Sequence, residues 1–252
     1  MTMVKMIITD LDGTLLRSDK TISDYTVDVL RRCQMAGIKI VFATARSTQA
    51  ASRFRDRFAP DVFVGYGGAL VMAGEEIIHR FDIPPEIANR IIKECLETPE
   101  VTGVHVINES VALSNNPEPG MTHYQRTDFS RENSNGYLKI SLNASDPVAV
   151  ENIAVHFPMC DMLRYTGEDL YRFANRDAVK WNAVKAIAEH YSYDTGDFIA
   201  FGDDINDLEM IQKCGTGVAV KNAVSKVLSA AKYICDTNDN DGVAKWIEER
   251  VL

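Results

Sequence analysis

Apolar runs and helix-like stripes alternate along the first part of the chain. Three short runs are mostly apolar: Met6–Asp10, Lys39–Thr44 and Asp61–Tyr66. Between the first two, Ser23 is a candidate helix N-cap, and apolar residues then recur at helical spacing, at Tyr25, Val29, Cys33 and Ala36. Apolar strands that alternate with helices indicate a parallel sheet covered by helices on both faces.

The middle of the chain has a different pattern of strand-like and helical segments. Strand-like runs lie close together there, at Val104–Ile107, Val111–Ser114, Tyr137–Leu142, Met162–Tyr165 and Leu170–Ala174. Helical segments begin near Pro84 and after Pro147. Closely spaced strands with two helices are typical of an antiparallel sheet in an α+β unit.

After Val179 the alternation of apolar strands and helices returns. A helical stripe over Trp181–Tyr191 is followed by strand-like runs at Phe198–Gly202, Gly217–Val220 and Tyr233–Cys235. The pattern therefore predicts a parallel-sheet α/β core that an α+β insert interrupts. We expect the discontinuous core at residues 1–81 and 177–252 and the insert at residues 82–176.

Composition and charge narrow the class of protein. The 252 residues include 27 Lys and Arg against 36 Asp and Glu, a formal net charge of −9. Such a chain lacks the basic face that releases counterions from a phosphate backbone, so we expect no nucleic acid partner. No apolar run approaches the roughly 18 residues of a membrane span, and Met6–Ile8 is too short for a secretory signal, so we expect no membrane partner.

The five cysteines are widely scattered and form no Cys-x-x-Cys motif: Cys33, Cys95, Cys160, Cys214 and Cys235. An odd number at such spacing supports neither a disulfide framework nor a zinc ribbon. We interpret them as small apolar residues in a reducing compartment, which predicts a cytoplasmic location.

The first candidate chemical motif is Asp10-Leu11-Asp12-Gly13-Thr14, at the end of the first predicted strand. Ligands of open α/β sheets bind outside the carboxyl ends of the strands, so this position favours chemistry. Two carboxylates two residues apart at the end of a strand can place one at a reacting centre and the other beside a leaving group. Gly13 permits a sharp turn, and Thr14 supplies a hydroxyl group.

The second motif is Gly202–Asp207, again at the end of an apolar strand. It gathers three carboxylates and an amide, at Asp203, Asp204, Asn206 and Asp207. On a surface such a cluster is more often a solvated turn and helix cap. Opposite Asp10 on a parallel sheet, the same oxygens are the hard ligands that Mg²⁺ prefers.

Together these motifs resemble the haloacid dehalogenase superfamily, specifically Cof-type phosphatases with a large α/β cap. Asp10–Thr14 resembles the first motif of that family, Thr44 the second, Lys180 the motif-three lysine, and Gly202–Asp207 the fourth motif, G-D-x-x-N-D. The resemblance covers nearly the whole chain. It implies a Rossmann-like, doubly wound parallel-sheet core with an inserted α+β cap domain.

The resemblance also implies phosphoryl transfer through a covalent aspartyl-phosphate. Asp10 would be the nucleophile, and Asp12 would protonate the leaving alcohol and then deprotonate the attacking water. The cofactor would be Mg²⁺, held by Asp10, Asp203 and the backbone carbonyl of Asp12. Asp207 is interpreted as a partner of the ligands or a water-mediated ligand, rather than a direct one.

Thr44 and Lys180 would bind the phosphate oxygens on which transition-state charge develops. Without the other motifs, a threonine that ends a strand is usually a cap, and a lone lysine is usually solvated. Asn206 is expected to reach the substrate phosphate or ester oxygen. Arg46 has two interpretations: a substrate contact, or an ion-pair partner for an acidic neighbour at the end of the sheet.

The predicted function is hydrolysis of small phosphorylated metabolites, with sugar phosphates as the favoured class, because a cap that excludes water suits small phosphate esters. Two alternatives remain open: a phosphotransferase or phosphomutase that uses the same intermediate, and a non-catalytic metabolite-binding protein. The polar segment Asn115–Asn135 either contacts a sugar or acid group of the substrate or is a solvated loop. The chain is expected to be a monomer or a homodimer.

Overall fold

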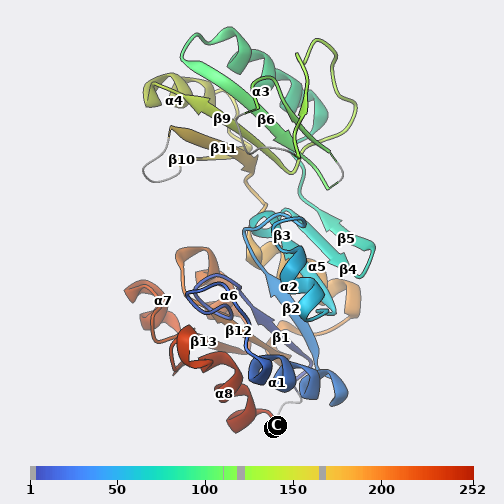
Figure 1. The fold of residues 1–252 in the computed structure, drawn as a ribbon, viewed down its shortest axis with the longest axis vertical. Coiled ribbons are helices and arrows are strands. Elements are labelled where there is room, and N and C mark those ends of the chain that lie inside the picture. Colours follow the sequence, from blue (N-terminus) through green and yellow to red (C-terminus); the bar gives the residue numbers. More distant parts are fainter. Residues whose placement is uncertain (1–3, 110, 118–122, 165–168) are drawn as a thin grey trace. The chain divides into compact units, whose positions relative to one another are not determined.

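The computed structural model of the chain describes residues 4–109, 111–117, 123–164 and 169–252. It contains two compact units (Figure 1). The core unit consists of Met1–His79 and Val179–Leu252, and the inserted unit of Arg80–Ala178. The inserted unit thus interrupts the core unit in the middle of the sequence, where the change in the spacing of the strand-like runs predicts an insertion. In the described residues, no helix has the length and apolar character that crossing a bilayer requires.

The core unit is built on one sheet of eight described strands. Their order is β14 (Tyr233–Cys235), β13 (Thr216–Val220), β12 (Phe198–Gly202), β1 (Met6–Thr9), β2 (Lys39–Ala43), β3 (Val62–Gly65), β4 (Leu70–Ala73) and β5 (Glu76–Arg80). Neighbours from β14 to β3 pair in parallel. The predicted α/β class with a doubly wound parallel sheet is therefore confirmed.

The strands β4 and β5 are not predicted by the pattern of apolar runs. β4 pairs antiparallel with β3, so one edge of the sheet departs from the parallel pattern. β5 lies at that edge and is mostly exposed or half-buried, because a single neighbour covers it. An edge strand lacks the continuous apolar run that marks the central strands, and this explains why its residues carry no clear strand signal.

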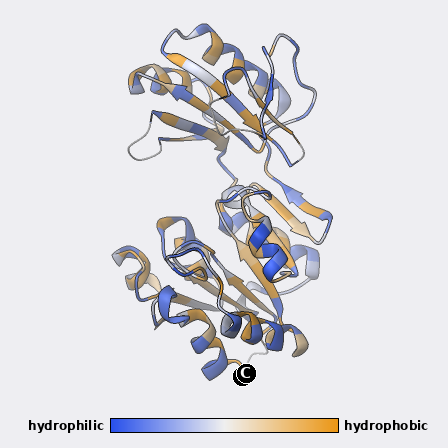
Figure 2. Cartoon of the chain, viewed as in Figure 1, coloured by the Kyte–Doolittle hydropathy of each residue, from blue (hydrophilic) through white to orange (hydrophobic). Residues whose placement is uncertain are grey.

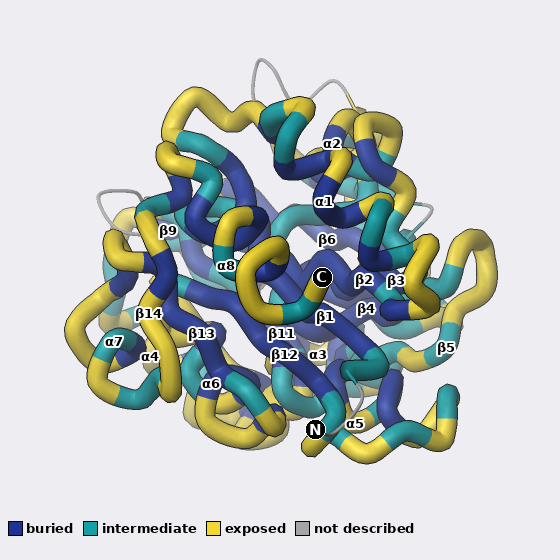
Figure 3. Tube along the Cα trace, turned by 90° about the horizontal axis from the view of Figure 1, so that it is seen from below, coloured by how far each residue is buried: buried dark blue, intermediate teal, exposed yellow. Residues whose placement is uncertain are grey.

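The central strands are buried because their residues are apolar on both faces. All four residues of β1 are buried, as are all five of β12 (Figure 3). Two groups of helices pack around the sheet: α1 (Asp24–Met35) against α8 (Gly242–Arg250), and α5 (Lys180–Tyr191) and α7 (Ser225–Ala230) against α6 (Leu208–Lys213). The predicted N-cap of α1 is confirmed, since the Ser23 side chain accepts a hydrogen bond from Thr26 N.

The inserted unit contains a second sheet of six described strands. Their order is β10 (Cys160–Arg164), β11 (Leu170–Asn175), β9 (Lys139–Ala144), β6 (Val101–Ile107), β7 (Ala112–Ser114) and β8 (Gln125–Arg126). All pairs are antiparallel except β7 with β8. The predicted antiparallel sheet is confirmed, although the expected strand end at Tyr165 lies outside the described residues.

The helices α3 (Pro85–Glu97) and α4 (Pro147–Ala154) pack against the strands of this second sheet. Their buried side chains join those of the strands in a separate apolar core, which includes Ile91, Val106 and Phe173. Apolar and polar residues alternate along these strands (Figure 2). One face of the sheet is therefore apolar and covered by the helices, and the other carries polar side chains. Of the polar segment Asn115–Asn135, residues 118–122 lie outside the described residues.

Candidate active site

The two acidic motifs meet at the carboxyl ends of neighbouring parallel strands. Asp10 directly follows β1, and Asp203 directly follows β12. The two strands are paired so that Thr9 stands beside Phe201, which brings both motifs to the same edge of the sheet. Thr44 follows β2, the neighbour of β1 on its other side. The sheet topology thus gathers residues that lie far apart in the sequence.

Lys180, the first residue of α5, lies between two carboxylates. Its Nζ atom donates hydrogen bonds to Asp10 Oδ1 and Asp207 Oδ1, each at 2.6 Å, and its side chain is only 3% exposed. Gly68, with φ +119°, supports this position because any side chain there would collide with the backbone of Val179 and Lys180. The start of α5 therefore approaches the site closely enough for Lys180 to reach both acids.

Asp203 and Asp207 have different surroundings. Asp203 Oδ1 accepts a hydrogen bond from Thr14 Oγ1 at 2.5 Å, and Gly13, with φ +81°, leaves the space that the Asp203 carboxylate occupies. Asp207 is fully buried, and its Oδ2 atom accepts from the backbone N–H groups of Asp203 and Asp204. Both Asp207 oxygens therefore already have donors, which leaves Asp10 and Asp203 as the better candidates for direct metal ligands.

The charges of this cluster are not balanced within the protein. Burial, together with the nearby Asp207 and Asp203, raises the pKa of Asp10 to about 7 against the attraction of Lys180. Burial also raises the pKa of Asp203. Although burial alone favours the neutral amine, Asp10 and Asp207 raise the pKa of Lys180, so this lysine is charged. One cation thus faces three carboxylates.

A divalent cation fits this arrangement. Asp10, Asp203 and Asp207 each offer one oxygen atom, and these atoms lie within 4.8 Å of one another. Carboxylate oxygens are the ligands that Mg²⁺ prefers, and a divalent ion would balance the excess negative charge that Lys180 leaves. The donor set is therefore suitable for magnesium.

Asp12 lies in a different electrostatic environment. Arg46 binds its carboxylate with two hydrogen bonds, of 2.6 and 2.7 Å, and Lys20 Nζ donates a third at 2.9 Å. Burial alone raises the pKa of Asp12, but these bonds outweigh burial and lower it to about 2. In this structure Asp12 is therefore ionised. Of the two interpretations of Arg46, the structure contains the ion pair with an acidic neighbour.

The two other predicted residues differ in exposure. Thr44 is buried, and its hydroxyl oxygen accepts a hydrogen bond from Arg46 N at 3.2 Å. Asn206 lies on the short 3₁₀ turn Ile205–Asp207 and is exposed. No motif predicts two further contacts, Lys20 with Asp12 and the Asn222 side-chain amide with the Gly13 carbonyl. Both depend on loops that only the folded chain brings together.

A doubly wound sheet with carboxylates and a buried lysine at its strand ends defines an α/β protein with a candidate active site at that edge of the sheet. Comparison with known families makes this more specific. Residues 7–247 match the family of haloacid dehalogenase-like hydrolases, so the chain belongs to that family. The predicted resemblance to its Cof-type phosphatases is confirmed, and the chain is an enzyme of this phosphatase class.

Individual relatives cover nearly the full length of the chain. HMP-PP phosphatase of Enterobacter sp. (strain 638) is 25% identical over 92% of this chain and 89% of its own. A 5-amino-6-(5-phospho-D-ribitylamino)uracil phosphatase of Bacillus subtilis is also 25% identical, over 97% and 96%. Among solved structures, a haloacid dehalogenase-like hydrolase from Bacteroides thetaiotaomicron has a TM-score of 0.82 at 26% identity, over 97% of this chain and 98% of that one.

Proposed function

We propose that the protein is a Mg²⁺-dependent phosphatase that hydrolyses small phosphorylated metabolites, with sugar phosphates as the favoured class, through an aspartyl-phosphate on Asp10. The observation that carries this proposal is the buried cluster in which Lys180 contacts both Asp10 and Asp207 beside Asp203. Its uncompensated acids suit a metal cofactor, and its location at the strand ends suits a substrate.

Asp10 is the proposed nucleophile. Lys180 holds one of its oxygens, which orients the carboxylate and keeps a positive charge beside the phosphate oxygens. A bond forms between an Asp10 oxygen and phosphorus while the bond from phosphorus to the ester oxygen breaks. A water molecule then attacks the same phosphorus, which releases inorganic phosphate and restores the Asp10 carboxylate.

Asp12 is the proposed general acid and base. It gives a proton to the departing alcohol oxygen and later accepts a proton from the attacking water. Because Arg46 and Lys20 keep Asp12 ionised in this structure, the first of these steps requires them to release Asp12 and requires Asp12 to take up a proton from solvent beforehand. The substrate phosphate offers Arg46 an alternative anion. Arg46 is therefore proposed to pair with Asp12 before the substrate binds and to contact the substrate afterwards.

The proposed magnesium ligands are Asp10, Asp203 and the backbone carbonyl of Asp12. The bound ion would neutralise negative charge, so that an anionic carboxylate can approach an anionic phosphate. Asp207 orients the cluster, because its two oxygens bind Lys180 and the backbone of the Asp203–Asp204 turn. Thr44 and Asn206 are proposed to bind substrate oxygens.

The inserted unit is the proposed cap domain, at residues 82–176, which reads the part of the substrate beyond the phosphate. The relatives support a small substrate: their names specify HMP-PP and a phosphoribityl aminouracil, and a solved structure of the same fold is a HAD subclass IIB sugar phosphatase. The five cysteines are buried and unpaired, which supports the proposed reducing, cytoplasmic location.

A panel of small phosphate esters, assayed for Mg²⁺-dependent phosphate release, tests this function. We expect turnover of at least one sugar phosphate and a fall in kcat of about 10⁴-fold or more in Asp10→Asn, since the nucleophile is lost. Asp28→Asn, which removes an exposed carboxylate from α1, is the matched control and should keep full activity. Circular dichroism checks that both variants fold.

Three results would contradict the proposal. Undiminished turnover in a folded Asp10→Asn variant would exclude the aspartyl-phosphate. Phosphorylated acceptor in place of free phosphate, with a sugar acceptor present, would replace the hydrolase with a phosphotransferase. Absence of turnover on the whole panel would favour a metabolite-binding protein.

A further inference from the structure

The polar face of the sheet in the inserted unit carries an ordered row of side chains. Strand register places Ser114 (β7) beside His105 (β6), His105 beside Ser141 (β9), and Ser141 beside Arg172 (β11). Residues directly opposite each other on paired strands point to the same face. The row therefore runs across four strands on the face opposite α3 and α4.

Two cations of this face lie next to each other. Lys139 precedes Ser141 by two residues on β9, so its side chain projects from the same face. Arg172 stands opposite Ser141 on β11 and is therefore the diagonal neighbour of Lys139. Both residues are half-buried. Two like charges are thus held side by side where water only partly screens them.

These two cations have no acidic partner among the described residues. Arg80 of the same unit, by contrast, pairs with Asp82 and Glu109. Burial lowers the pKa of Lys139, and the neighbouring Arg172 lowers it further. Asp161, the acid that shares their face on β10, is exposed and forms no ion pair in the described part of the chain. The pair therefore has an unbalanced positive charge.

A buried hydroxyl group lies between the two cations. Ser141 is only 5% exposed, and within the described segments its side chain has no hydrogen-bond partner. Its neighbour His105 does not provide one, because the two ring nitrogens of His105 contact Ser114 Oγ at 2.8 Å and Asn143 Oδ1 at 2.6 Å. A hydroxyl that makes no hydrogen bond within the described segments has its donor available to a ligand.

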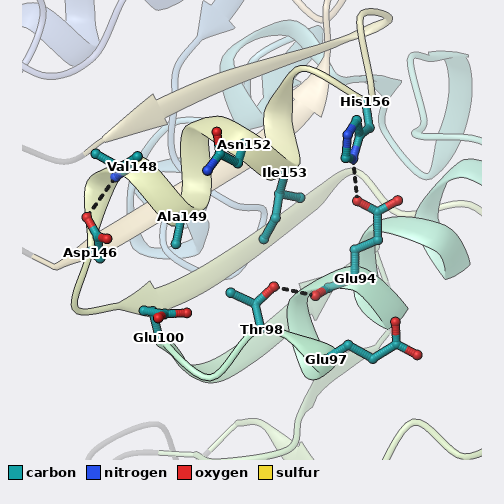
Figure 4. A pocket seen from close by; sticks show the side chains of 10 residues that line it. All are labelled: Glu94, Glu97, Thr98, Glu100, Asp146, Val148, Ala149, Asn152, Ile153 and His156. Atoms are coloured by element: carbon teal, nitrogen blue, oxygen red, sulfur yellow. Dashed lines mark hydrogen bonds and ion pairs between the residues drawn. The ribbon is translucent and has the colours of Figure 1, made fainter.

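The acids of the inserted unit gather elsewhere. Four of them, Glu94, Glu97, Glu100 and Asp146, line an open groove of about 560 Å³ between α3 and α4 (Figure 4). This groove lies on the helical side of the sheet, and in it His156 already contacts Glu94 at 2.9 Å. These carboxylates therefore cannot compensate Lys139 and Arg172, which project from the other face.

We propose that Lys139, Ser141 and Arg172 form an anion-binding site that takes a phosphate or carboxylate group. An ammonium, a guanidinium and a hydroxyl then supply charge-assisted donors to one anion. The anion has two possible sources: a second acidic group of the substrate, or a free anion. The first source rests on the proposed function, because it requires the inserted unit to read the substrate, whereas the binding site itself does not.

Calorimetric titration of the full chain with inorganic phosphate, in EDTA, tests the site without turnover. Under these conditions the acidic cluster of the core unit lacks its metal and repels anions, and loss of binding in variants of the inserted unit assigns the bound phosphate to that unit. We expect Lys139→Met and Arg172→Met to weaken binding tenfold or more, and Ser141→Ala to weaken it severalfold. Lys139→Arg should retain binding because it keeps the charge. Lys93→Met, on the exposed side of α3, is the matched control and should bind like the wild type.

A wild-type protein that does not bind phosphate, or variants that bind as tightly as the wild type, would overturn the proposal. Thermal melting confirms that each variant is folded, and the charge-conserving Lys139→Arg separates loss of charge from loss of structure. These outcomes do not depend on catalysis, so a failure of the proposed phosphatase function leaves this test valid.

The source of the anion is assigned by kinetics with Mg²⁺ present. A sugar phosphate is compared with the same sugar phosphate bearing an added carboxylate. If the substrate supplies the second anion, Lys139→Met lowers kcat/KM tenfold or more for the sugar phosphate with the carboxylate and less than threefold for the one without it. If a free anion occupies the site, the variant changes both substrates equally while phosphate binding in EDTA is lost.

Discussion

The two units of this protein hold charge clusters of opposite sign. In the core unit, Lys180 faces three carboxylates, and the surplus is negative. In the inserted unit, Lys139 and Arg172 stand together without an ion-pair partner among the described residues, and the surplus is positive. Burying unbalanced charge lowers stability, so each cluster is suited to a ligand of the opposite charge. The sign of the surplus therefore indicates the ligand: a metal ion in the core unit and an anion in the inserted unit.

A third cluster, around Asp241, has balanced charges. Asp241 accepts hydrogen bonds from Arg17 Nη2 at 2.5 Å and from the Ser23 hydroxyl at 2.9 Å. Here one cation meets one carboxylate, and neutral donors satisfy the remaining oxygen lone pairs. Such a cluster needs no ligand. It provides an internal reference for the two unbalanced clusters.

The sharpest test of this comparison is the same substitution at two lysines. Lys180→Met leaves three carboxylates, of which Asp10 and Asp207 are buried, without their cation, so in EDTA we expect the free energy of unfolding to fall by about 3 kcal/mol. Urea denaturation at neutral pH measures the change. Lys226→Met, which removes an exposed lysine of α7, should stay within about 0.5 kcal/mol of the wild type. Equal stability of the two variants would show that Lys180 does not compensate the acids.

Metal addition should stabilise the acid-rich cluster. With Mg²⁺ at about 100 times its dissociation constant, we expect about 2.7 kcal/mol of added stability, because the ion binds only the folded state. Differential scanning calorimetry, with and without EDTA, measures the shift. Asp203→Asn should abolish most of it, whereas Asp28→Asn should preserve it. A shift that persists in Asp203→Asn would place the ion elsewhere.

The balanced cluster should respond to acid and not to ligands. Burial raises the pKa of Asp241, but the hydrogen bonds from Arg17, Ser23 and Thr26 outweigh burial, so its pKa is lowered. A carboxyl whose folded pKa is lowered stabilises the protein above the unfolded pKa of about 3.9, and this contribution is lost as pH falls through the folded pKa.

We therefore expect Asp241→Asn to destabilise the protein by about 1.5 kcal/mol at pH 7, with the difference shrinking below about pH 4. Urea denaturation across this pH range measures it. Neither Mg²⁺ nor phosphate should change the difference. A pH-independent difference would mean that shape, and not charge, explains the effect.

The smallest expected effect has the opposite sign. Lys139→Met removes a half-buried cation that has no acidic partner among the described residues, so the ligand-free protein should gain up to about 1 kcal/mol. Urea denaturation in phosphate-free buffer measures the gain. Added phosphate should narrow it, because only the wild type retains its ligand. A loss of stability in Lys139→Met would argue that this lysine has a structural partner.

Much of the core unit is predictable because its signals are local. The central strands are continuous apolar runs, and the acidic motifs directly follow two of them, so the order of residues alone implies that the acids lie at strand ends. The strands β4 and β5 carry no such signal, because an edge strand needs no strong pattern. The sequence also leaves the interaction of Arg46 open, because it does not specify which loop residue meets Asp12.

The sequence by itself determined the α/β core, the interrupting α+β insert and the identity of the chemical groups at Asp10, Asp12 and Asp203. Only the tertiary structure decided which charges meet. Lys180 reaches Asp10 across 170 residues of chain because α5 begins where β1 ends, close to Gly68. Lys139 and Arg172 become neighbours only through the register of β9 and β11. Local sequence sets the preference of each segment, but the balance of buried charge is a property of long-range pairing.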